Sequence, residues 1–77
     1  MTAAARNVRF VTDELIVELH DGREVSASIA DTRSLRFLLD ASEEARANWT
    51  IEPHGFAVYW PDLDDGVEVC HLLDSQR

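Results

Sequence analysis

The chain has 77 residues, which leaves room for one domain with a single hydrophobic core. Its 15 acidic and 7 basic side chains give a net charge of −8, which disfavours direct binding to nucleic acid or to anionic membranes. A single cysteine excludes an internal disulfide, and no apolar run is long enough for a membrane span or a signal peptide, so we expect a cytoplasmic protein.

The negative charge is concentrated in the second half of the sequence. Residues 1–36 hold five arginines and six acids, whereas residues 37–77 hold two arginines and nine acids. A field of this sign speeds encounter with basic protein surfaces through electrostatic steering. The same charge also serves solubility, so composition alone leaves both interpretations open.

The first half of the chain is predicted to form a three-stranded antiparallel meander. Residues 1–6 have no periodicity and are expected to be a loose tail, which leaves residues 7–74 as one α+β domain. The first strand contains Val8, and the dipeptide Asp21-Gly22 suits the tight turn between the second and third strands. The alternating apolar residues that should share one buried face are Leu15, Val17, Leu19, Val25, Ala27 and Ile29.

The apolar residues change to helical spacing in the middle of the chain. Asp31 or Thr32 can cap a first helix. Its expected buried stripe, at positions i, i+3 and i+4, is Leu35, Leu38 and Leu39. A second helical turn should begin after Ser42, an N-cap residue followed by acids, and should run to about Asn48.

The last part of the chain is predicted to contain a second hairpin. Residues 49–52 and 56–60 indicate two strands, separated by a turn at residues 53–55 that contains Pro and Gly. Residues 61–66 are expected to be an acidic loop, and the apolar spacing of residues 67–73 fits both a strand and a helix. The predicted fold is therefore α+β: a small antiparallel sheet built from a three-stranded meander and a second hairpin, with a one- or two-helix insertion packed on one face.

One segment near the end of the chain, residues 59–73, has the sequence YWPDLDDGVEVCHLL. It resembles a small bacterial family, domain of unknown function 2442, whose members carry a Trp-Pro-Asp-Leu-Asp-Glu-Asp type segment followed by an apolar stretch that ends in Leu-Leu. The resemblance extends back through the hairpin turn at residues 21–23 and the second helical segment at residues 43–49. It covers roughly residues 8–73.

The chain departs from that family's pattern in three places. Residues 28–29 and 32–35 replace a Pro-Leu and Pro-Arg-Leu region, residues 53–55 replace a glycine-rich turn, and Gly66 replaces the last acid. The resemblance implies an α+β domain with antiparallel strands and a helical insertion, without an established activity. Some members are fused to a helix-turn-helix segment or encoded beside a small partner, as toxins and antitoxins are. This chain ends four residues after Leu73, so we expect the binding domain without a DNA-reading module.

No cofactor or metal site and no enzymatic activity are expected from these residues. The acidic loop 61–66 lacks the spacing of a calcium loop, in which Gly stands at the sixth position and Glu at the twelfth. Cys70-His71 lacks the second, separated pair of ligands that structural zinc sites use, although His20 and His54 are also present. Cys70 is expected to be a buried thiol, and its acidic surroundings disfavour a catalytic thiolate.

Aromatic residues gather with acids in the last part of the chain. Tyr59 and Trp60 are neighbours on a predicted strand, so one ring should fill the core while the other can be exposed beside the carboxylates. The alternative is that both rings are covered within the domain. An exposed ring rimmed by acids is typical of a contact point for a basic partner. The predicted partner-binding residues are Asp62, Asp64, Asp65, Glu68, Glu52, Glu43, Glu44, Tyr59 and Trp60.

These features favour a small acidic protein-binding module that inhibits or neutralises its partner. It would cover a basic surface of that partner, of the kind used to bind nucleic acid. Two forms fit this hypothesis: a phage-type nucleic-acid mimic such as an anti-CRISPR protein, and an antitoxin-like subunit paired with a small toxin. The alternative is a sensory or structural module that binds a small ligand or self-associates, with the charge serving only solubility.

Overall fold

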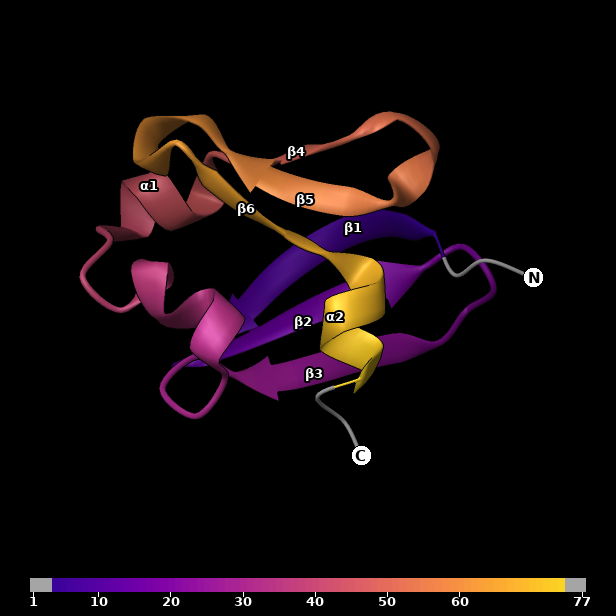
Figure 1. Cartoon of the computed structure of the whole chain (residues 1–77), viewed down its shortest axis with the longest axis horizontal. Helices are drawn as coiled ribbons and strands as arrows, with labels where there is room; N and C mark the ends of the chain where they lie inside the picture. The colour runs from indigo at the N-terminus through magenta and orange to yellow at the C-terminus, as the bar shows by residue number, and fades with distance from the viewer. Residues whose placement is uncertain (1–3, 75–77) are drawn as a thin grey trace.

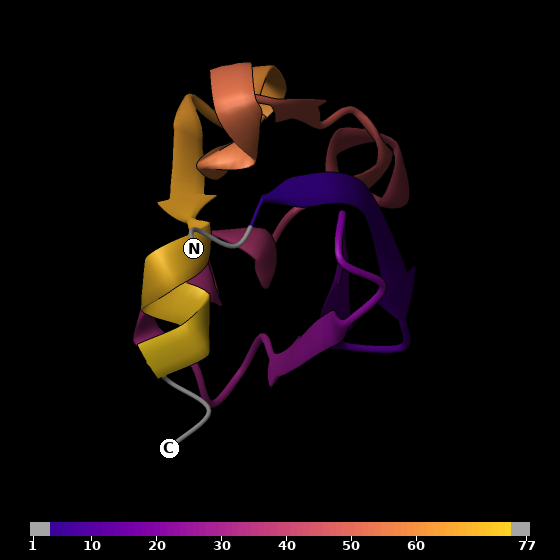
Figure 2. The same ribbon diagram turned by 90° about the vertical axis from the view of Figure 1, so that its right-hand side faces the viewer.

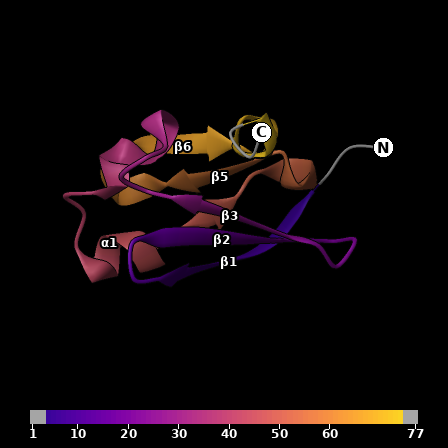
Figure 3. The same ribbon diagram turned by 90° about the horizontal axis from the view of Figure 1, so that it is seen from below.

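The structure, a computed structural model, describes residues 4–74 and consists of two three-stranded antiparallel sheets with short helices around them (Figure 1). The first sheet has the strand order β1-β2-β3, and the second has the order β4-β5-β6. The second sheet lies above the first (Figure 2), and the strands of both run along the same long direction (Figure 3). The α+β fold predicted from the sequence is confirmed.

The first sheet is the predicted meander. β1 spans Ala5–Val11, β2 spans Glu14–Leu19 and β3 spans Glu24–Ser28. Residues paired across antiparallel strands share a face, and this pairing brings the apolar residues of all three strands together on the inner side. Leu15 and Val17 are fully buried there, and all six residues predicted for this face are buried.

The turn between β2 and β3 lies where the Asp-Gly dipeptide predicts it. Gly22 has a φ angle of 92°, which glycine adopts without a steric cost. The Arg23 N–H donates to the carboxylate of Asp21 at 3.0 Å, and the Leu19 N–H donates to the Arg23 carbonyl at 2.8 Å. The turn is thus closed by both a side chain and the backbone.

The chain enters the first sheet earlier than its sequence predicts. Ala5 begins β1 and is only 2% exposed, and a Cβ on Gly55 would come within 2.7 Å of its nitrogen. The Ala4 carbonyl accepts a hydrogen bond from the His20 N–H at 2.9 Å. The prediction of a loose tail is therefore wrong from Ala4 onward. Alanines give no hydrophobic periodicity in the sequence, but their small side chains fit where two backbone segments come close. Residues 1–3 of the predicted tail lie outside the described residues.

The first helical segment is a 3-10 helix, η1, at Arg33–Leu38. With three residues per turn, Leu35 and Leu38 lie in line, and both are fully buried. Leu39 follows the helix and is 42% exposed, so the prediction that it shares their buried stripe is wrong. Thr32 occupies the N-cap position, but its side chain makes no capping hydrogen bond.

The second helical segment is α1, Glu43–Ala47. As the sequence predicts, Ser42 caps this helix, because its Oγ accepts a hydrogen bond from the Ala45 N–H at 3.1 Å. None of the helices in the described part of the chain is long and apolar enough to cross a membrane.

The second sheet contains the predicted second hairpin and one further strand. β4, Thr50–Ile51, pairs with β5, Ala57–Trp60, and the 3-10 turn η2, Pro53–Gly55, lies between them. β6, Asp65–Glu68, pairs antiparallel with the other edge of β5. The helix α2, Val69–Asp74, follows β6 directly and lies beside β3.

Residues 67–73, whose apolar spacing fits both a strand and a helix, contain the end of a strand and the start of a helix. β6 ends at Glu68 and α2 begins at the next residue, so both apolar spacings are present in turn. The predicted loop is shorter than expected, since only the 3-10 turn η3, Pro61–Leu63, and Asp64 lie outside the sheet. The prediction of a loop through Gly66 is wrong because strand pairing with β5 begins at Asp65.

Trp60 is the largest fully buried side chain and connects four elements. Its indole N–H donates to the Arg46 carbonyl in α1 at 2.9 Å. Phe10 of β1 and Phe37 of η1 contact the indole edge-on, with ring centroids at 6.4 and 5.6 Å. Trp60 therefore joins β5 to α1, β1 and η1.

Replacement of Trp60 by Phe should lower the free energy of unfolding by about 2–4 kcal/mol, because the smaller ring leaves a cavity and the Arg46 carbonyl loses its donor. Chemical denaturation followed by circular dichroism measures this loss. Trp49→Phe is the matched control, since Trp49 is only partly buried against the same core, and it should cost less. Equal losses in the two variants would contradict a central role for Trp60.

Candidate protein-binding surface

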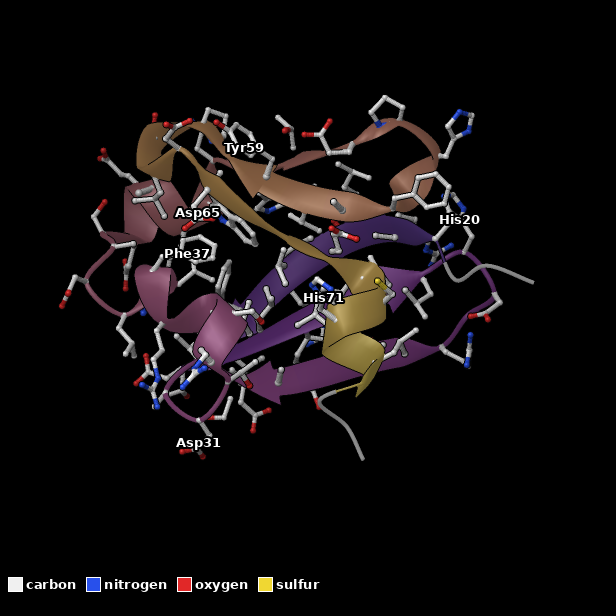
Figure 4. All side chains as sticks on the ribbon, in the orientation of Figure 1. His20, Asp31, Phe37, Tyr59, Asp65 and His71 are labelled. Atoms are coloured by element: carbon white, nitrogen blue, oxygen red, sulfur yellow. The ribbon has the colours of Figure 1, made fainter. Side chains whose placement is uncertain are left out.

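Tyr59, labelled in Figure 4, lies on the second sheet near several carboxylates. Along β5, Trp60 faces the core and Tyr59 faces outward. Glu68 pairs with Ala57, and the Glu52 N–H donates to the Ala57 carbonyl at 2.9 Å, so the two glutamates flank Ala57. We define the acidic face as Glu52, Tyr59, Asp64 and Glu68, together with Asp65 at its rim, which pairs with Trp60 across the strands but whose charge reaches the Tyr59 hydroxyl.

Tyr59 is held in place by a short hydrogen bond. Its hydroxyl donates to Oδ1 of Asp64 at 2.6 Å, and Asp64 ends η3 in the left-handed conformation, which Asp tolerates better than most residues. The pKa of Tyr59 is raised, first by this hydrogen bond, then by loss of water, and then by the charges of Asp64, Glu52 and Asp65. Three carboxylates therefore act on one hydroxyl.

Gly66 provides the space in which the Tyr59 ring lies. The two residues pair across β5 and β6, and a Cβ on Gly66 would lie 3.3 Å from Cδ1 of Tyr59 and 2.6 Å from the Val58 carbonyl oxygen. A larger residue at this position would have to displace both backbone and ring. The sequence indicates Gly66 only as a departure from a family pattern, and its role follows from the strand pairing.

Two carboxylates of this region, Asp62 and Asp65, are bonded to uncharged donors. Asp62 accepts a hydrogen bond from the side-chain amide of Asn48 at 3.1 Å, which links η3 to the end of α1. Asp65 accepts one from the Gly66 N–H at 2.8 Å. Because neither donor is charged, these bonds fix the two side chains without neutralising them.

Most acids of the first sheet and its turns, by contrast, are paired with arginine. Arg9 lies 2.8 Å from Glu24 and 3.8 Å from Glu18 on the outer side of that sheet, and Arg23 lies 2.7 Å from Asp21 in the turn. Within residues 4–74, no arginine forms an ion pair with a carboxylate of the acidic face. The charge of the acidic face is thus not balanced by the described part of the chain.

A model of the family described as "Protein of unknown function (DUF2442)" matches residues 5–75, which include both sheets. The chain belongs to this family. No curated protein matches the sequence of this DUF2442 member.

Two solved structures have the same fold as this DUF2442 chain. A crystal structure of a protein of unknown function from Rhodospirillum rubrum has a TM-score of 0.80 at 19% identity, over 97% of this chain and 89% of that one. A solution NMR structure of an uncharacterized protein from Chromobacterium violaceum has a TM-score of 0.75 at 24% identity, over 96% of this chain and 67% of that one. At these identities the likeness shows the fold alone.

Four of the predicted contact residues of this DUF2442 chain lie outside the acidic face: Asp62, which is bonded to Asn48, and Trp60, Glu43 and Glu44. Trp60 is fully buried, so the prediction that it contacts a partner is wrong, whereas the prediction that one ring of the pair fills the core is confirmed. Glu43 and Glu44 are exposed in the first turn of α1. Glu43 lines a shallow pocket of about 330 Å³ with Phe10 and other residues of β1 and α1, and no contact described for residues 4–74 joins it to Tyr59.

Cys70 is exposed, so the prediction of a buried thiol is wrong. Since α2 begins at Val69, the helical spacing turns Val69 and Leu72 toward the core, where they are 2% and 1% exposed. Cys70 and His71 face solvent instead, and the Cys70 thiol lies 3.6 Å from a carboxylate oxygen of Glu68.

Tyr59 should ionise above the usual tyrosine pKa of about 10, which absorbance at alkaline pH can measure because the chain has a single tyrosine. Since the folded-state pKa is raised, the associated stability is present below the unfolded pKa and is lost as the pH rises through the folded pKa. Asp64→Asn should lower the pKa of Tyr59. Asp62→Asn is the matched control, because Asp62 is bonded to Asn48, and an equal shift in both variants would contradict the assignment.

Proposed function

We propose that this chain is a protein-binding module that inhibits or neutralises its partner by covering a basic surface with the acidic face. The observation that supports this most directly is an outward tyrosine held among four carboxylates that have no arginine partner in residues 4–74. Carboxylates that are not neutralised within the chain remain available to the lysines and arginines of another protein.

The fixed geometry of Tyr59 suits a contact point. Tyrosine rings are enriched among the residues that contribute most to binding, and a ring already held by Asp64 loses little rotamer freedom when it is covered. Glu52 and Glu68 lie on either side of Ala57, two residues before Tyr59 on β5. A basic surface can therefore contact both carboxylates while it covers the Tyr59 ring. The charges supply steering and specificity, and the ring supplies buried area.

The partner surface is proposed to be one that otherwise binds nucleic acid. Such surfaces present lysine and arginine to phosphates, and carboxylates compete for the same guanidinium groups through charge-assisted hydrogen bonds. The proposal includes two forms, a phage-type nucleic-acid mimic such as an anti-CRISPR protein and an antitoxin-like subunit paired with a small toxin. In both forms the chain acts in the cytoplasm by binding rather than by catalysis.

One observation favours a second candidate, a module that binds a small ligand. The pocket of about 330 Å³ between β1 and α1 has an apolar wall at Phe10 and a charged group at Arg46. Arg46 is already engaged, however, because it donates to the Leu38 carbonyl at 2.9 and 3.0 Å and lies over the Phe10 ring. The acidic face has the larger set of unneutralised groups and is the preferred site.

The test is a pull-down with the tagged chain from nuclease-treated cell extract, followed by an affinity measurement on the recovered partner. The acidic-face variant combines Glu52→Gln, Asp64→Asn and Asp65→Asn, which keep the shapes of the side chains and remove three charges. This variant should bind the partner about tenfold more weakly or worse, and its binding should depend less on salt. The wild-type chain should displace a short DNA duplex from the same partner.

A matched control removes three charges elsewhere. It combines Glu14→Gln, Asp31→Asn and Asp40→Asn, which are exposed acids outside the acidic face, so that its net charge equals that of the first variant. The control should bind as the wild type does. If both variants lose affinity equally, net charge rather than the acidic face drives binding, and if neither loses affinity, the interface lies on another surface.

A further inference from the structure

Three different metal-binding side chains meet where β6 passes into α2. The ligand atoms of Glu68, Cys70 and His71 all lie within 4.8 Å of one another, and all three residues are exposed. The spacing of Cys70 and His71 in the sequence lacks the separated pairs of a structural zinc site, but the fold adds a carboxylate from the end of the preceding strand.

The backbone that carries these side chains is anchored on its other side. The Val69 N–H donates to the Phe56 carbonyl at 2.8 Å, and the side chains of Val69 and Leu72 are buried in the core. These contacts fix the strand-to-helix junction and leave Cys70 and His71 directed to solvent; Figure 4 shows His71 at the start of α2. The three ligands therefore come from a well-anchored segment.

We propose that Glu68, Cys70 and His71 bind one zinc ion. A thiolate, an imidazole and a carboxylate are the three donor types that zinc takes in proteins, and three protein ligands leave a fourth position open to water. Zinc–sulfur and zinc–oxygen bonds of about 2.3 and 2.1 Å at a tetrahedral angle place the two ligand atoms about 3.6 Å apart. The Cys70 sulfur already lies 3.6 Å from Oε2 of Glu68.

The remaining ligand needs only a small adjustment. The nitrogen of His71 lies within 4.8 Å of the other two ligand atoms, and its ring is exposed, so rotation toward the ion displaces no core contact. In the described part of the chain, Glu68 has no arginine partner that would compete with a cation. The sulfur and nitrogen donors favour zinc over calcium or magnesium, which prefer oxygen ligands.

The test is titration of the reduced, untagged chain with Zn²⁺ by isothermal titration calorimetry, followed by titration with Co²⁺ monitored by absorbance. We expect one ion per chain, and a sulfur-to-cobalt charge-transfer band that reports the Cys70 ligand. Cys70→Ser and His71→Gln should each lower the zinc affinity by about tenfold or more, and the serine variant should lose the band. Both changed residues are exposed, so neither substitution removes a core contact, and circular dichroism checks that each variant remains folded.

His20→Gln is the matched control, because His20 is also exposed but lies outside this group. It should bind zinc with the wild-type affinity. The proposal is overturned if the wild type takes up no zinc, if the cobalt complex lacks the charge-transfer band, or if Cys70→Ser binds zinc unchanged, which would mean that surface carboxylates hold the ion non-specifically. These measurements use no partner protein, so their outcome is independent of the proposed function.

Discussion

The buried ring of Trp60 sets the register on which both sides of the second sheet depend. Its indole is fixed by the Arg46 carbonyl of α1 and by edge-on contacts with Phe10 and Phe37. Because successive side chains of a strand point to opposite faces, fixing Trp60 inward also fixes Tyr59 outward. A slip of β5 by one residue would exchange the two rings and break the core contacts and the tyrosine hydrogen bond together.

Among residues 4–74, most acids of the first sheet are neutralised by arginine, whereas those around Tyr59 on the second sheet are not. The molecule therefore has one side with unpaired negative charge. On the first sheet, Glu18 and Glu24 have arginine partners, and such exposed pairs add little stability but neutralise the surface. On the second sheet, like charges gather around Tyr59, which works against the folded state of a domain with a small core. Under the proposed function, a basic partner would relieve that repulsion.

Rules that act between neighbours in the sequence predict much of this fold. The turn at Asp21–Gly22, the alternation along the strands and the cap at Ser42 all follow from adjacent residues. The sequence predictions that the structure overturns concern residues whose burial depends on contacts between distant segments or on where a helix begins. Ala5 is buried because Gly55 approaches its backbone, and Cys70 is exposed because α2 begins one residue before it. Neither condition can be read from hydrophobic spacing.

The candidate site likewise depends on strand pairing, which composition cannot predict. Charge counts indicate an acidic second half, but Glu52 and Glu68 come together only because both lie beside Ala57. The same pairing places Glu68 at the border between the acidic face and the pair Cys70 and His71. A zinc ion held there would cancel part of the charge that a basic partner is proposed to meet. The proposed metal site and the proposed binding surface are therefore linked through one carboxylate, and zinc would weaken the attraction rather than strengthen it.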